Sequence, residues 1–92
     1  MSTVRIPPVL RVQAGGAKTL VLAGATVGEV LDALVTAHPG LGAQLFTDDG
    51  VLNRFVNVYV DGQDVRYTGE LATEVGDRDE VVILPAMAGG AG

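Results

Sequence analysis

The chain opens with a short stretch in which apolar and polar residues alternate. Val4 and Ile6 would lie on one face of a strand and Arg5 on the other. Pro7 and Pro8 have no amide hydrogen, so we expect a bulge there or a place where ladder hydrogen bonds are not needed. The glycines of "QAGGA" can adopt positive φ and would turn the chain into a second strand at "KTLVLAG". An antiparallel hairpin is predicted.

From Thr26 the apolar period becomes helical. Thr26 is placed to cap the helix, and Glu29 follows it at the spacing of a capping box. Pro39 and Gly40 would end the helix. The apolar stripe that would face the core consists of Val27, Val30, Leu31, Leu34 and Val35.

The second half of the chain returns mostly to strands. We expect a short helical turn over 43–46 and then a strand at "FVNVYV". "DGQD" would turn this strand, and "VRYTG" would begin a short returning strand. "ELATEVGDRD" has room for one turn of helix at most, and "EVVILP" is the last strand.

This order of elements, β-β-α-β-β-β with a short fourth strand, predicts an α+β fold. It is the order of the ubiquitin-like β-grasp, a mixed sheet wrapped on one main helix. The first and last strands would pair in parallel at the centre of the sheet. A ferredoxin-like fold would need a second full helix. We expect one domain over 1–85 and a flexible C-terminal tail over 86–92.

One helix can cover only one face of this sheet. Val81 and Ile83 would point toward the helix, so the alternating residues would point away from it. An apolar patch on an uncovered face usually marks a partner site, although apolar residues are also simply common in strands. The predicted partner-docking residues are Phe55, Tyr59, Val82, Leu84, Pro85 and Met87.

Charge and composition narrow the classes of partner. The formal net charge is -5, and the six basic residues are scattered along the sequence, which argues against nucleic acid as a partner. No apolar run approaches the ~20 residues of a membrane span, and the proline pair interrupts any signal-peptide core. Cysteine is absent, so no disulfide or thiolate metal site is possible. We expect a cytoplasmic protein that binds neither a membrane nor a metal.

The chain ends in "LPAMAGGAG", in which the only large residue after Pro85 is Met87. Seven extended residues reach at most ~23 Å, enough to enter a buried site on another protein. Glycine lets a backbone pass through a narrow channel, because it has no Cβ to clash. Ala88, Gly89 and Gly90 are therefore the predicted threading residues.

Almost the whole chain resembles the ubiquitin-like sulfur carriers of bacteria, which include the thiamine-pathway carrier and the small subunit of molybdopterin synthase. The similarity is strongest in "TVGEVLDAL", "RFVNVYVDGQDVR" and "DEVVILPAMAGG". Within that family the chain is similar to the subgroup that carries sulfur for cysteine biosynthesis in actinobacteria. Molybdopterin, thiamine or another sulfur-containing metabolite are the alternative products.

This resemblance implies a carrier that has no catalytic residues and binds no cofactor of its own. A partner similar to the ubiquitin-activating enzyme would use ATP and Mg²⁺ to adenylate the terminal glycine, which then becomes a thiocarboxylate. A pyridoxal-phosphate-dependent cysteine synthase would accept the sulfur. A JAMM-type zinc metallopeptidase would be the third partner, because relatives end at Gly-Gly while this chain continues with Ala91 and Gly92.

The position of the reactive carboxylate follows from that extension. We expect cleavage between Gly90 and Ala91, which makes Gly90 the glycine that is activated; the alternatives are activation of Gly92 or an inactive paralogue. A ubiquitin-like modifier joined to lysines, or a plain interaction module, are the other functions left open.

Other candidate sites are weak. "AGGAKT" departs from the phosphate-loop pattern at two glycine positions. His38 is the only histidine and would lie at a helix end, where a cation interacts with the helix dipole. Asp48 and Asp49 precede Gly50 and are typical of a turn. Catalysis by this chain alone is not indicated.

Overall fold

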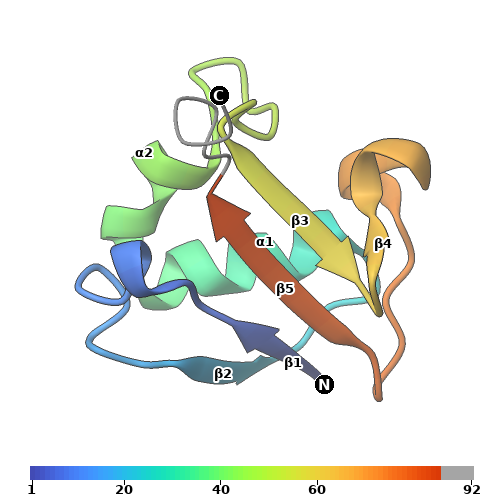
Figure 1. Ribbon diagram of the computed structural model, residues 1–92, viewed down its shortest axis with the longest axis horizontal. Coiled ribbons are helices and arrows are strands. Elements are labelled where there is room, and N and C mark those ends of the chain that lie inside the picture. The colour runs from blue at the N-terminus through green and yellow to red at the C-terminus, as the bar shows by residue number, and fades with distance from the viewer. Residues whose placement is uncertain (86–92) are drawn as a thin grey trace.

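The computed structural model describes residues 1–85 of the 92-residue chain. A five-stranded sheet lies in front of one main helix (Figure 1). The strands are β1 (Ser2–Arg5), β2 (Thr19–Leu22), β3 (Val56–Val60), β4 (Gln63–Asp64) and β5 (Glu80–Pro85). The α-helices are α1 (Val27–Ala37) and α2 (Gly42–Leu45), and 3-10 turns lie at η1 (Pro8–Leu10), η2 (Pro39–Leu41), η3 (Val65–Tyr67) and η4 (Glu70–Ala72).

The sheet has the order β2-β1-β5-β3-β4, which places the last strand at its centre. β5 runs parallel to β1, with Val4 opposite Val81, and antiparallel to β3, with Val58 opposite Ile83. The ubiquitin-like β-grasp, the mixed sheet and the central parallel pair are thus confirmed. The division into a domain over 1–85 and a tail over 86–92 stays a prediction.

The first hairpin is present, but its first strand is shorter than the alternation suggested. β1 ends at Arg5, and Pro8 begins the 3-10 turn η1 instead of a bulged strand. Proline suits the first position of a helical turn, because its missing N–H would have no partner there. Gly15 and Gly16 take φ values of 67° and 84°, as expected for the turn that leads to β2.

Helix α1 begins at a capping box. The Glu29 amide donates to Thr26 Oγ1 at 3.2 Å, and Glu29 Oε1 accepts from the Ala25 amide at 2.8 Å. The carboxylate therefore satisfies the amide before the cap residue, one position earlier than in the usual box. Both bonds supply acceptors for amides that have no partner inside the helix.

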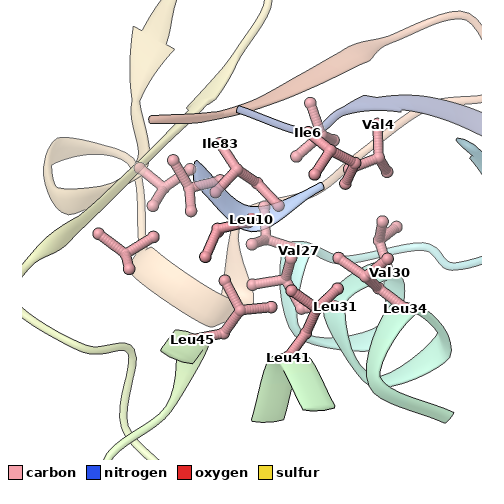
Figure 2. Close-up of a cluster of buried hydrophobic side chains, with 14 of the residues drawn as sticks. Val4, Ile6, Leu10, Val27, Val30, Leu31, Leu34, Leu41, Leu45 and Ile83 are labelled. Atoms are coloured by element: carbon pink, nitrogen blue, oxygen red, sulfur yellow. The ribbon is translucent and has the colours of Figure 1, made fainter. Parts of the chain in front are cut away.

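The core lies between α1 and the inner face of the sheet. Figure 2 shows Val4 of β1, Ile6 just after it and Ile83 of β5 meeting Val27, Leu31 and Leu34 of α1, with Leu41 and Leu45 closing one end. Four residues of the predicted helical stripe are fully buried, namely Val27, Val30, Leu31 and Leu34. Val35 is only half-buried and packs at the edge of this core.

The expected returning strand at "VRYTG" is wrong. The chain returns earlier, at Gln63–Asp64, and Val65–Tyr67 forms the 3-10 turn η3. Asp61 and Gly62 both have positive φ, 49° and 88°, which is the geometry of a two-residue type I′ hairpin loop. Such a loop makes Gln63 the partner of Val60. The returning strand therefore starts within the "DGQD" segment that was expected to form the turn.

The two short helical turns of the second half are confirmed. α2 covers Gly42–Leu45 and η4 covers Glu70–Ala72, one turn as expected. Within residues 1–85, no helix has the length and apolar character needed to cross a membrane.

Candidate functional site

The face of the sheet that α1 leaves uncovered carries the candidate site. Strand register determines which side chains share this face, because neighbours across a ladder point the same way. Arg5, Val82 and Tyr59 lie opposite one another in one row across β1, β5 and β3. Leu84 lies opposite Asn57 in the next row.

Leu84 of β5 is exposed on this face, and Phe55, which directly precedes β3, is exposed as well. Phe55 is 59% exposed and Leu84 is 44% exposed, while Val58 and Ile83 on the inner face are at 0% and 1%. Val82 and Tyr59, which lie opposite each other on the outer face, are half-buried. The predicted alternation is therefore confirmed, and an apolar patch remains open to solvent directly before residue 86.

Arg66 organises the polar border of this patch. Its Nη1 donates to Asn57 Oδ1 at 2.7 Å, and its Nη2 donates to the carbonyls of Arg54 at 2.8 Å and Val56 at 3.2 Å. The guanidinium therefore joins η3 to the start of β3 beside Leu84, the neighbour of Asn57. These bonds fix a side chain that would otherwise be free in solvent.

Sequence reasoning did not single out Arg66. The available signal was local: the Asp64 carboxylate accepts from the Arg66 amide at 2.9 Å, an Asx-type turn that starts η3 and aims the arginine back along β3. The spacing of residues in the sequence does not by itself predict that the Arg66 side chain bonds to Asn57.

The remaining site residues lie at or beyond the limit of the described chain. Pro85 closes β5 and pairs with Val56 through the backbone register. Met87, Ala88, Gly89, Gly90, Ala91 and Gly92 lie outside the described residues, so their threading, processing and reactive roles stay predictions.

The weaker candidates gain nothing from the structure. His38 is the C-cap residue of α1 and lies near Gly15. Asp48 and Asp49 are exposed in a turn that the Gly50 amide closes onto the Thr47 carbonyl at 2.9 Å. "AGGAKT" leads into β2 and not into the helix that a phosphate loop requires. Over the described residues, no three His, Cys, Asp or Glu side chains form a group suited to a metal ion.

The decisive comparison is with protein families. The model of the ThiS family matches residues 4–90, nearly the whole chain, and its match ends at the second glycine of Gly89-Gly90. The chain belongs to the ThiS family. Its relatives in this family are named as carriers and modifiers.

Among those relatives, the sulfur carrier protein CysO of Mycobacterium tuberculosis is 46% identical over 90 residues, covering 96% of this chain and 97% of that protein. Small archaeal modifier protein 1 of Haloferax volcanii is 47% identical over 66 residues, covering 72% of this chain and 71% of the modifier.

Solved structures of the ThiS-family relatives agree with the fold. The chain matches a structure from the Amycolatopsis orientalis BexX/CysO complex with a TM-score of 0.90 and 47% identity, over 98% of this chain and 100% of that chain. That relative is thus a β-grasp protein crystallised with a protein partner.

Proposed function

We propose that this chain is a sulfur carrier protein: its C-terminal glycine is adenylated by an ATP-dependent partner enzyme and converted into a thiocarboxylate that donates sulfur in biosynthesis. The observation that carries the proposal is the ThiS-family match over residues 4–90, which includes the diglycine. The 46% identity to the CysO sulfur carrier supports the cysteine route over molybdopterin or thiamine.

Two chemical steps would convert the terminal carboxylate into a thiocarboxylate. A carboxylate oxygen of the terminal glycine attacks the α-phosphorus of ATP, and pyrophosphate leaves. Sulfide then attacks the carbonyl carbon of the acyl adenylate, and AMP leaves. With a persulfide as the donor, the same attack gives an acyl disulfide, and a second thiol must cleave its S–S bond, which releases the thiocarboxylate and leaves a disulfide between the two thiols. The resulting thiocarboxylate is a sulfur nucleophile at neutral pH, which a free carboxylate is not.

The described residues supply binding in this scheme and leave the chemistry to partners. Ordering the backbone of residues 86–90 in a partner's channel would cost on the order of 5–10 kcal/mol. This is comparable to the whole free energy of micromolar to nanomolar binding, about 8–12 kcal/mol. A docked surface must therefore offset the cost of threading, and the patch around Leu84 is the apolar surface next to the tail.

Processing would precede activation. We propose that a zinc metallopeptidase of the JAMM type cleaves between Gly90 and Ala91, so that Gly90 becomes the reactive terminus. The end of the family match at residue 90 supports this position, because Ala91 and Gly92 fall outside it. Cytoplasmic location is part of the same proposal, since the activating step consumes ATP.

A second function has its own support. Small archaeal modifier protein 1 is 47% identical over 66 residues, and a modifier would join the same activated glycine to a lysine amine. The products differ: a thiocarboxylate on the free chain in the first case, and an isopeptide bond to another protein in the second.

The test compares four proteins: the full chain, a chain ending at Gly90, a chain ending at Ala88, and the full chain with Gly90→Pro. They are expressed in the organism that encodes the chain, purified, and measured by intact mass. The full chain is expected to lose Ala91-Gly92 and to exchange one oxygen for sulfur. The chain ending at Gly90 should gain sulfur without cleavage.

The two remaining chains are the controls. The chain ending at Ala88 should carry no sulfur, and Gly90→Pro should stay uncleaved and without sulfur. Sulfur on an uncleaved full chain would instead assign the reaction to Gly92. Conjugates of higher mass that survive thiol reagents would favour the modifier, and an unchanged mass for all four proteins would overturn both proposals.

A further inference from the structure

Basic residues that are scattered in the sequence gather at one groove in the structure. A groove of about 420 Å³ runs between the η1 segment, the start of β2 and the end of β5. Three of the six basic residues of the chain line it, namely Arg5, Arg11 and Lys18. Val82 and Leu84 form its other wall, and no acidic residue lines it.

The three basic side chains of the groove differ in the partners that they have within the chain. Arg5 Nε pairs with Glu80 Oε2 at 2.6 Å, so its charge is partly balanced. Arg11 Nε donates to the Ile6 carbonyl at 3.1 Å, which fixes the stem of the side chain at the groove. Lys18 is exposed, and its side chain has no hydrogen bond or ion pair among the described residues. Two positive charges are therefore left for an external anion.

The position of the groove links it to the C-terminal segment. Leu84 belongs both to its wall and to the exposed apolar patch, and only Pro85 separates Leu84 from residues 86–92. A partner that docks on the apolar patch at Leu84 would therefore place its own surface close to Arg11 and Lys18. In a chain of net charge -5, an approaching acidic protein would be repelled except at such a site.

We propose that this groove receives an acidic segment of the activating enzyme, with glutamate or aspartate side chains against Arg11 and Lys18 and an apolar side chain against Leu84. The inference rests on the proposed function and adds the chemistry of the partner's surface. Charge complementarity of this kind raises the association rate and sets the orientation of docking more than it raises affinity.

The first experiment does not depend on activation. Amide chemical shifts of the isotopically labelled full chain are followed by NMR during titration with a short synthetic peptide that carries several glutamates around one leucine. Shifts are expected at Arg5, Arg11, Lys18 and Leu84, and a matched peptide with glutamine in place of glutamate should bind at least about tenfold more weakly. Raising NaCl from about 0.05 M to 0.5 M should weaken the binding of the glutamate peptide.

Matched variants locate the effect. Lys18→Glu should abolish the peptide-induced shifts, and Lys18→Arg should retain them. Arg78→Glu makes the same change of charge in the turn before β5, at the other end of that strand, and should bind like the wild type. Thermal unfolding checks the fold of each variant; only the Lys18 backbone carbonyl is bonded, to the Ile6 amide at 2.8 Å, so its side chain is free to change.

The second experiment uses the activating enzyme and ATP–pyrophosphate exchange, with the chain in its activatable form ending at Gly90. Lys18→Glu should lower kcat/KM at least about fivefold at low salt, through KM, while Arg78→Glu stays within about twofold. Exchange that is absent even with the wild type would overturn the proposed function, and the peptide titration would still decide on the groove.

Three results would overturn the groove proposal. The glutamate peptide shifts no groove amide; Lys18→Glu behaves like Arg78→Glu in both experiments; or a short DNA duplex shifts the same amides at lower concentration than the peptide. A chain ending at Pro85 adds a fourth result. If the groove amides of the peptide-free full chain differ from those of this shorter chain in the same way as peptide binding shifts them in the shorter chain, the occupant is the chain's own C-terminal segment.

Discussion

At the scale of single residues, several carboxylates in the described part of the chain accept hydrogen bonds from backbone amides at turns and at the helix cap. Asp79 is the clearest case. Its Oδ2 accepts from the Gly76 amide at 2.7 Å in the turn before β5. This backbone hydrogen bond holds the pKa of Asp79 below its ordinary value of 3.8, although partial desolvation acts the other way.

A pH-dependent contribution to stability follows from that lowered pKa. Folding favours the ionised form of Asp79, so its stabilisation is fully present above the ordinary pKa near 3.8 and is lost as the pH falls through the lower folded pKa. Asp79→Asn should therefore unfold more easily than the wild type at pH 7, and the difference should vanish in strong acid. Urea unfolding at a series of pH values measures this.

Asp49→Asn is the matched control, because it removes the same charge from an exposed turn in which no hydrogen bond to the carboxylate is found within residues 1–85. A stability difference for Asp79→Asn that stays constant from neutral to acid pH would show that the carboxylate charge plays no part in the turn.

At the scale of elements, the capping box fixes where α1 starts. Thr26→Ala removes the acceptor for the Glu29 amide and should lower the free energy of unfolding by about 0.5–2 kcal/mol. In a domain of this size, that corresponds to a fall in Tm of roughly 4–8 °C per kcal/mol. Thermal unfolding followed by circular dichroism measures it.

Thr36→Ala controls for the general effect of alanine on helix propensity. Thr36 lies in the same helix, is exposed, and its Oγ1 donates to the Asp32 carbonyl at 2.8 Å, a bond that leaves no amide unsatisfied when it is removed. It should leave Tm unchanged or slightly higher. Equal losses from the two substitutions would contradict a specific role for the cap.

The elements also show which parts of the fold the sequence could predict. Strong local patterns were sufficient for α1, where cap, stripe and stop all agree, for β3, where every second residue is valine, and for β5, which is a continuous apolar run after Glu80. The pattern failed at Gln63, because the two positive-φ residues Asp61 and Gly62 already complete the turn. A two-residue "DG" loop predicts that pairing resumes at once, and applying that rule would have placed β4 correctly.

The candidate site was predictable only in its apolar half. Alternation along β5 places Val82 and Leu84 on the uncovered face without knowledge of any other strand. The basic groove depends on η1 folding back beside the end of β5, which brings Arg11 and Lys18 to Leu84. That contact is between segments far apart in the chain, and the Arg66–Asn57 bond likewise needs the β3–β4 hairpin to be known.

At the scale of the whole molecule, the sheet separates two tasks by its two faces. The inner face supplies the core against α1, so its residues tolerate no charge, while Leu84 on the outer face is 44% exposed and contributes little to folding. Leu84→Asp should therefore leave the fold and its Tm nearly unchanged. It should abolish activation, because it places a carboxylate at the apolar contact and beside the groove proposed to bind acids.

Val21→Asp separates a local effect of Leu84 from a general effect of charge on this face. Val21 is 61% exposed on the same side of the sheet, but it lies on the edge strand β2 opposite Thr3, whose other neighbour is Glu80 at the far end of β5. ATP–pyrophosphate exchange should be lost for Leu84→Asp and kept for Val21→Asp, with NMR spectra of both showing the native dispersion. If Leu84→Asp is activated at the wild-type rate, the end of β5 is not the docking surface, and the cost of ordering residues 86–92 must be met by contacts of those residues themselves.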